Sequence, residues 1–167
     1  HFIPTDSIVL KIDKEAVKRS GMVLNDSVPD YLHINLRGRN ALYKKDLMML
    51  EMLAECNWER PLYFAVTVGR DNYLSLQDNF VQEGLAFRIT PYNATRTGNY
   101  IDADKMYDNL MNKFKFGGID NPNIYLDETV FRMCLTHRRM FSILAQTLIA
   151  RGDKERALKV LQKVDKE

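Results

Sequence analysis

Hydrophobic and polar residues follow one another along the chain in patterns that predict both helices and strands. Apolar residues at intervals of three and four predict an amphipathic helix over residues 41–56. Alternation of apolar and polar residues predicts a half-buried strand over 31–37 and a shorter strand over 8–12. The nearly unbroken apolar run at 62–68 predicts a strand that is buried on both faces, in the middle of a sheet. Residues 85–90 are a further strand candidate.

The helix over residues 41–56 has an apolar face and a recognisable end. The apolar face is formed by Leu42, Leu47, Met49, Leu50, Leu53 and Ala54. Asn57 can end the helix, and Pro61 keeps Arg60 out of helical geometry. The succession of a strand, this helix and the apolar run predicts a right-handed crossover between two parallel strands.

The segments between these elements are short. Asp13 can cap a short helix, and residues 73–80 are expected to form a short helix or an irregular segment. Residues 93–100 are small, polar and turn-rich, which predicts an exposed loop. Asp102 or Asp104 can start the helix that follows.

The last third of the chain has a helical pattern. Asp127 can cap a long amphipathic helix, Gly152 can close it, and Asp153 can cap a second helix. The apolar positions of the long helix are Val130, Met133, Leu135, Phe141, Leu144, Leu148 and Ile149. The order of small and large apolar residues over 144–161 resembles one unit of a tetratricopeptide repeat. A single helical hairpin that finishes a domain and a true repeat module both remain open.

Together these elements predict an α+β fold, with a small mixed β-sheet, packed helices and a C-terminal tetratricopeptide-like helical hairpin. We expect a mixed α/β domain over residues 1–125 and the hairpin, packed on it, over 126–167. No run approaches the apolar length of a membrane span. The chain opens at His1 without an initiator methionine, which is compatible with a fragment of a longer protein.

Composition narrows the function classes only a little. The 24 basic and 22 acidic residues give a net charge of +2, so neither nucleic acid nor an anionic membrane surface is expected as the main partner. Cys56 and Cys134 both lie in predicted helices and are expected to be buried free thiols. The three histidines, His1, His33 and His137, share no short spacing, so we expect no metal site and no cofactor.

Motifs for catalysis are absent from the sequence. There is no glycine-rich phosphate loop and no Gly-x-Ser-x-Gly elbow. Cys134 lies three residues before His137, as a nucleophile and its base could, but the apolar helix face favours core packing for both. Asn93-Ala94-Thr95 matches the N-glycosylation sequon, a three-residue pattern that often occurs by chance.

Polar and aromatic residues at the two ends of the apolar run are the candidate ligand-binding residues. They are Trp58, Arg60 and Tyr63 before or within the run, and Arg70, Asp71, Asn72 and Tyr73 after it. Ligands often bind at strand ends, aromatic rings stack on sugars, and Arg, Asp and Asn can bond to sugar hydroxyls. The competing interpretation is a capped turn with an ion pair, plus aromatic residues that anchor the helix to the sheet. We favour it, because no catalytic pair is evident.

Four segments together resemble a known family. They are NALYKKDLMMLEMLAECNWERPLYFAVTVGRDNYLSL, EGLAFRITPY, MYDNLMNKFKFGG and NPNIYLDETVFRM. They resemble the C-terminal soluble region of a bacterial family of multi-spanning membrane proteins of unknown function, similar to protein O-mannosyltransferases, which are C-type glycosyltransferases. The resemblance covers most of residues 40–133. It is looser before Asn40, and after Met133 it is mainly a helical pattern.

This resemblance implies a function that the residue patterns did not indicate. The chain would act with an upstream transmembrane region of the same protein, on the periplasmic side of the inner membrane. The donor-binding acidic motif of such enzymes lies between N-terminal membrane helices, so no catalytic residue is transferred to this sequence. We therefore expect a non-catalytic domain that positions a glycan or polypeptide acceptor. The alternatives are a protein-interaction module built on the C-terminal hairpin and a small independent enzyme with its site at residues 70–73.

Overall fold

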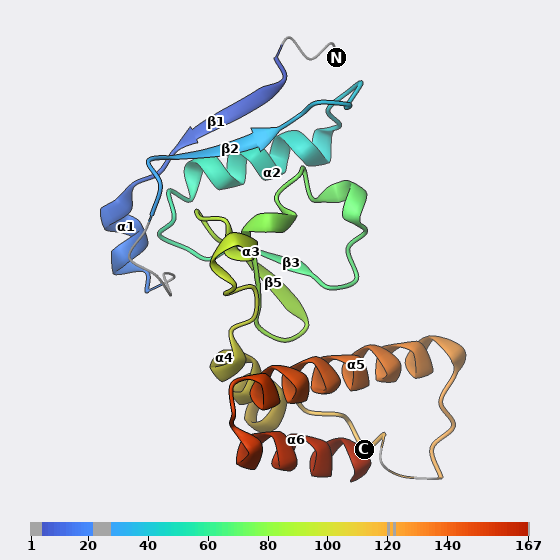
Figure 1. The fold of residues 1–167 in the computed structure, drawn as a ribbon. Helices are drawn as coiled ribbons and strands as arrows, with labels where there is room; N and C mark the ends of the chain where they lie inside the picture. Colours follow the sequence, from blue (N-terminus) through green and yellow to red (C-terminus); the bar gives the residue numbers. More distant parts are fainter. Residues whose placement is uncertain (1–4, 22–27, 120, 122, 167) are drawn as a thin grey trace. The chain divides into compact units, whose positions relative to one another are not determined.

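The structure is a computed structural model that describes residues 5–21, 28–119, 121 and 123–166, which leaves out His1 (Figure 1). The chain divides into two compact units, His1–Val81 with Ala86–Tyr100 (the first unit), and Gln82–Leu85 with Ile101–Glu167 (the second unit). The predicted α+β class is confirmed, with two small antiparallel sheets and six α-helices in the described ranges. The boundary expected at residue 125 falls inside the second unit, and a separate domain over 126–167 stays a prediction.

The first unit contains the described strands, apart from the last residue of β4. In chain order its elements are β1 (Ser7–Lys11), α1 (Lys14–Arg19), β2 (Tyr31–Asn35), α2 (Lys44–Glu55), β3 (Tyr63–Ala65), the 3₁₀ turns η1 (Arg70–Asn72) and η2 (Gln77–Asn79), β4 (Phe80–Gln82, whose last residue belongs to the second unit), β5 (Ala86–Ile89) and α3 (Ala94–Thr97). The second unit contains α4 (Ala103–Asp108), the π-helical turn η3 (Asn109–Lys113), α5 (Glu128–Ala150) and α6 (Lys154–Lys166).

The predicted crossover between parallel strands is wrong. β2 pairs antiparallel with β1, with Ile34 opposite Ile8, and the two strands form a sheet of their own. β3 pairs antiparallel with β5 in a second sheet of order β3-β5-β4, with Tyr63 opposite Arg88. Antiparallel partners can be joined by short connections, so both strands satisfy their backbone groups without a crossover. Helix α2 thus connects two sheets instead of two strands of one sheet (Figure 1).

The apolar run at 62–68 is not the doubly buried central strand that we expected. Only residues 63–65 form a strand, and β3 lies at one side of its sheet. Burial alternates along the run, with Leu62, Phe64, Val66 and Val68 partly buried and Tyr63, Ala65 and Thr67 exposed. The chain then turns, and the Val68 amide donates a hydrogen bond to the Ala65 carbonyl at 3.0 Å. The run therefore packs through one face only.

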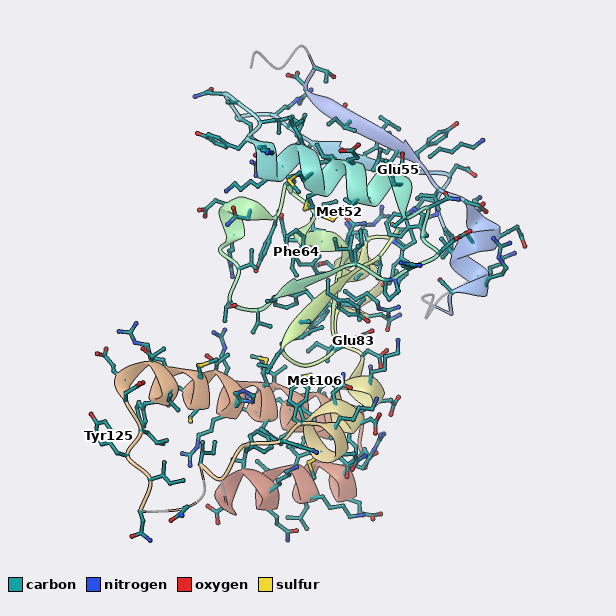
Figure 2. All side chains as sticks on the ribbon, turned by 180° about the vertical axis from the view of Figure 1, so that it is seen from behind. Met52, Glu55, Phe64, Glu83, Met106 and Tyr125 are labelled. Carbon is teal, nitrogen blue, oxygen red and sulfur yellow. The ribbon has the colours of Figure 1, made fainter. Side chains whose placement is uncertain are left out.

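One hydrophobic cluster joins both sheets and α2 in the first unit. Leu50 and Leu53 of α2 are buried in it as predicted, whereas Leu47 and Ala54 are exposed. At its centre the rings of Phe64, Tyr73, Phe80 and Phe87 lie with centroids 4.9 to 6.4 Å apart. Such tilted and stacked pairs add to the stabilisation from buried area. Figure 2 shows Phe64 beneath α2, on the inner side of β3.

Two other expectations for the first unit differ from the structure. Residues 93–100, expected to be an exposed loop, contain α3, because the Asn93 side chain accepts a hydrogen bond from the Arg96 amide at 2.8 Å and caps a short helix. Residues 73–80 are irregular with one 3₁₀ turn, as expected, but β4 beginning at Phe80 was not predicted.

The second unit is a helical assembly in which α4 and α6 both pack against α5. All three predicted caps are present: the carboxylates of Asp102, Asp127 and Asp153 accept hydrogen bonds from the amides three residues later at 2.8 to 3.0 Å. Small Ala145 and Ala157 are buried on α5 and α6, which lets the two helices of the predicted hairpin approach closely.

The long helix α5 is only partly a core helix. Phe141, Leu144 and Leu148 are buried as predicted, but Met133, Leu135 and Ile149 are exposed, and residues 128–139 include no buried side chain. Among the described helices, none has the length and apolar content that crossing a bilayer requires. Cys56 and Cys134 are free thiols, but each is partly instead of fully buried.

Candidate functional site

Two of the predicted ligand-binding residues lie in the core of the first unit. Trp58 is 3 % exposed and Tyr73 is 7 % exposed, and both belong to the central hydrophobic cluster. The Tyr73 hydroxyl donates a hydrogen bond to the Val68 carbonyl at 2.8 Å. Trp58 has a left-handed backbone with φ of 63°, which is uncommon for a bulky residue. Neither ring presents a face on which a sugar could stack without rearrangement.

The turn that carries Arg70, Asp71 and Asn72 is fixed by polar contacts. The side-chain amide of Asn72 donates to the Gly69 carbonyl at 3.2 Å, and its oxygen accepts a hydrogen bond from Lys45 Nζ. Arg70 and Asp71 are exposed, and their charged groups make no ion pair within the described ranges. The structure therefore leaves one cation and one anion available at the end of the run.

The start of α2 holds this turn through residues that the sequence patterns did not single out. Arg39 Nη2 donates to the backbone carbonyl of Asp71 at 2.8 Å, and Arg39 Nη1 lies 4.0 Å from the Asp46 carboxylate. Asp46 is buried and accepts a hydrogen bond from the Tyr43 amide at 2.9 Å. Arg39 and Asp71 are 32 residues apart, so no local spacing could have paired them. The nearest local signal is Asp46 itself, an acidic residue in the first turn of α2 whose carboxylate accepts from the Tyr43 amide.

Arg60 and Tyr63 are the exposed members of the other predicted group. Arg60 precedes β3, and Tyr63 opens it with 46 % of its surface exposed. Of the seven predicted residues, the accessible ones are therefore Arg60 and Tyr63 at the start of the run and Arg70 and Asp71 after its end. We call these four residues together the β3 surface. The structure brings Trp58 and Tyr73 together, but in the core and not at this surface.

A polar groove of about 430 Å³ lies at the start of α1. It is lined by Lys11, Ile12, Asp13, Lys14, Glu15 and Asn57. The Asp13 carboxylate accepts hydrogen bonds from the Ala16 and Glu15 amides, and these bonds hold its pKa below the ordinary value. Asp13 therefore caps the helix as an anion, and the groove has its main charged acceptor already engaged.

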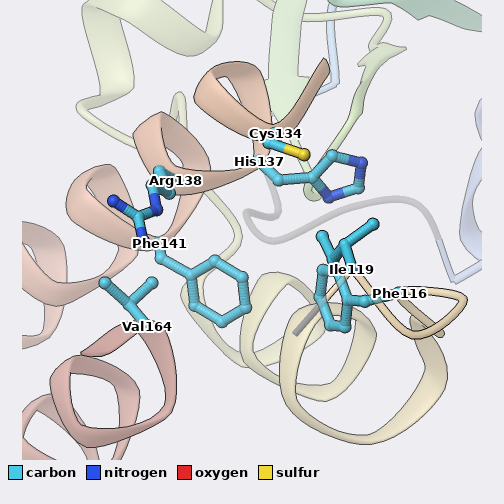
Figure 3. A pocket seen from close by; sticks show the side chains of 7 residues that line it. All are labelled: Phe116, Ile119, Cys134, His137, Arg138, Phe141 and Val164. Atoms are coloured by element: carbon cyan, nitrogen blue, oxygen red, sulfur yellow. The ribbon is translucent and has the colours of Figure 1, made fainter. Parts of the chain in front are cut away.

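The second unit contains a small cavity beside the Cys134 and His137 pair (Figure 3). Its volume of about 20 Å³ has room for one water molecule. Rings of Phe114 and Phe116 lie 6.1 and 5.5 Å from the His137 ring, and burial lowers the pKa of His137. No hydrogen bond joins Cys134 to His137 among the residues that the structure describes. This arrangement favours packing against the neighbouring phenylalanine rings over nucleophilic catalysis.

A polar cluster around the buried Glu83 in the second unit serves to hold the chain together. Lys105 Nζ lies 3.3 Å from the buried Glu83 carboxylate, and the Asn109 side chain donates to the Glu83 carbonyl at 2.7 Å. The Asp102 amide donates to the Gln82 carbonyl at 3.0 Å. These contacts attach residues 82–85 to α4 and η3. Within the described ranges, no three His, Cys, Asp or Glu side chains are placed to hold a metal ion.

Comparison with known proteins identifies a family over the whole residue range of the first unit. Residues 1–107 match the family described as TMEM260-associated domain 2. A search of the curated proteins gives no match, and a search of the solved structures gives none either. TMEM260-like proteins are membrane proteins and resemble protein O-mannosyltransferases, in agreement with the similarity noted from residue 40 as far as residue 107. The similarity noted for residues 108–133 lies outside the match and stays a prediction. Because the match spans more than half of the sequence, the chain belongs to the TMEM260-associated domain 2 family.

Proposed function

We propose that this chain is a non-catalytic, extracytoplasmic domain of a protein O-mannosyltransferase-like membrane protein, and that it positions the acceptor. The observation that carries the proposal is the family match over residues 1–107. In a bacterium the domain would lie on the periplasmic side of the inner membrane. The sugar-transfer chemistry would belong to the transmembrane region of the same protein, which is the domain's first partner.

The β3 surface is the proposed place of acceptor recognition. Arg60, Arg70 and Asp71 supply exposed donors and an acceptor for hydroxyl or peptide groups, and the half-exposed ring of Tyr63 offers a stacking face. Trp58, Asn72 and Tyr73 would serve this surface indirectly by holding the neighbouring turns.

Rigidity of the turn supports this role. Arg39 binds the turn through the carbonyl of Asp71, and Lys45 binds it through the side chain of Asn72. Both contacts leave the Arg70 guanidinium and the Asp71 carboxylate accessible. A surface that is already ordered loses less conformational entropy when it binds a ligand.

Calorimetric titration of the chain with sugars, glycopeptides and unglycosylated peptides tests the proposal. We expect saturable binding that is lost in Arg70→Ala and in Tyr63→Ala. Arg96→Ala, which removes an exposed arginine from α3, is the matched control and should bind normally. Absence of binding to every ligand at millimolar concentration would contradict acceptor recognition.

A protein-interaction module is the second candidate, and one observation favours it. Leu158 and Leu161 are exposed on α6, next to the buried Ala157 and Val160 that face α5. A helix with two apolar faces is typical of stacked helical repeats. If this hairpin holds the polypeptide, peptide binding should be lost in Leu158→Ser/Leu161→Ser and retained in Arg70→Ala.

A further inference from the structure

The N-terminal half of α5 (residues 128–139) exposes large apolar side chains instead of burying them. Phe131 is 54 % exposed and Leu135 is 50 % exposed, and their spacing of four residues places them on one face of the helix. In the loop before α5, Ile124 is exposed and Tyr125 is 89 % exposed. Figure 2 shows Tyr125 on the outer side of this loop.

Positive charge is concentrated on the same helix. From residue 128 to 151 the chain carries Arg132, Arg138, Arg139 and Arg151 against the single acid Glu128. That segment has a net charge of +3, while the whole chain has +2, so the remaining residues sum to −1. From the nearly balanced total charge we expected no anionic membrane partner. The total does not reveal that residues 128–151 form a basic segment.

Arg138 and Arg139 are the accessible part of this charge. Arg132 pairs with Glu128 at 2.5 Å, and Arg151 donates to a backbone carbonyl. Arg138 and Arg139 are exposed and form no ion pair within the part of the chain that the structure describes. They follow Leu135 by one helical turn, so apolar and cationic groups share a surface.

A bilayer with anionic headgroups fits this combination. Arginine can extend its guanidinium to lipid phosphates while its aliphatic stem remains among apolar groups. Tyrosine is enriched at the membrane–water interface, and Phe and Leu side chains can enter the boundary of the acyl region. Among alternative partners, a protein surface would equally accept the apolar residues, but would need acidic groups placed opposite Arg138 and Arg139.

We propose that the N-terminal half of α5, together with Ile124 and Tyr125, docks on the anionic phospholipid surface of a membrane. The chain's membership of a membrane-protein family makes such a surface available to it. The inference rests on the proposed function only in placing the domain beside a bilayer. Docking there would hold α5 against the lipid.

Co-sedimentation of the 167-residue chain with lipid vesicles tests this docking. We expect binding to phosphatidylcholine vesicles that contain phosphatidylglycerol, weaker binding to pure phosphatidylcholine, and loss of binding as salt rises. Arg138→Gln/Arg139→Gln should weaken binding about thirtyfold, since each basic residue near an anionic surface contributes roughly fivefold. Phe131→Ser/Leu135→Ser should weaken it about tenfold or more through lost apolar burial.

The matched control is Met48→Ser/Met52→Ser on α2, which changes two equally exposed apolar residues. It should bind vesicles like the unchanged chain, and circular dichroism should show that every variant is folded. No binding to either vesicle, or equal binding by all variants, would overturn the proposal. The proposal would also be overturned if light scattering detected a dimer and Phe131→Ser/Leu135→Ser dissociated it. The surface would then join two copies of the chain. The vesicles contain no glycan, so a failure of vesicle binding does not affect the calorimetric test of acceptor binding. The two proposals can therefore fail separately.

Discussion

Replacement of Trp58 by alanine should remove a central part of the first unit's core. Trp58 is 3 % exposed within the main hydrophobic cluster. An aromatic side chain buries about 150–250 Å², which at about 25 cal/mol per Å² corresponds to about 4–6 kcal/mol. Measured Trp→Ala losses in cores are about 3–5 kcal/mol, and we expect that range for Trp58→Ala. It is a large share of the about 5–15 kcal/mol that stabilises a typical domain.

Urea denaturation followed by far-ultraviolet circular dichroism measures this loss. Trp58 is the single tryptophan, so its fluorescence in the unchanged chain reports unfolding of the first unit separately. Trp58→Gly provides a contrast, because the φ of 63° at this position suits glycine. It should be at least as stable as Trp58→Ala, by up to about 1 kcal/mol. A loss below about 1 kcal/mol for Trp58→Ala would refute the placement of this ring in the core.

Three further predictions concern the second unit, one of them with a control in the first unit. Asp102→Ala removes the cap of α4 and should lower the free energy of unfolding by about 0.5–2 kcal/mol in urea titrations. Gly152→Ala should cost about 1 kcal/mol by the same measurement, because φ is 81° there, whereas Gly69→Ala, where φ is −65°, should be nearly neutral. Burial lowers the pKa of His137 in the folded chain below its ordinary value of 6.5. As pH falls through 6.5, the unfolded chain therefore takes up a proton before the folded chain does, and the free energy of unfolding decreases. His137→Leu should reduce the difference between unfolding curves at about pH 7.5 and about pH 5, and an unchanged difference would contradict this.

Local chemistry explains which elements were predictable. The helix starts predicted from aspartate caps were correct because such a cap acts within three residues, as Asp102 and Asp127 do. The helix expected from residue 41 has no such cap and begins at Lys44. Strand pairing was not predictable, because the run at 62–68 has apolar residues on both faces and nothing in it shows that the chain turns after Ala65. Its true partner, β5, is recognised only by the register that places Tyr63 opposite Arg88.

The candidate site was predictable in part, for a related reason. In the sequence, Trp58 and Tyr73 fit two roles equally well, because an aromatic ring with a polar edge can anchor a core or bind a ligand. The structure places both residues in the core. Arg39 was missed because its partner, Asp71, lies far along the chain. The exposed residues on α5 had the spacing of a core helix, and only the packing shows that Phe131 and Leu135 are exposed in the described structure.

Acceptor recognition by the first unit is tested most directly by nuclear magnetic resonance of the isotope-labelled chain during titration with a glycosylated peptide. Changes in amide shifts should cluster at Arg60, Tyr63, Arg70 and Asp71, on the surface beside β3, and should be absent in Arg70→Ala. Shift changes confined to α6, or no changes at millimolar peptide, would contradict the proposed role of this domain in positioning an acceptor.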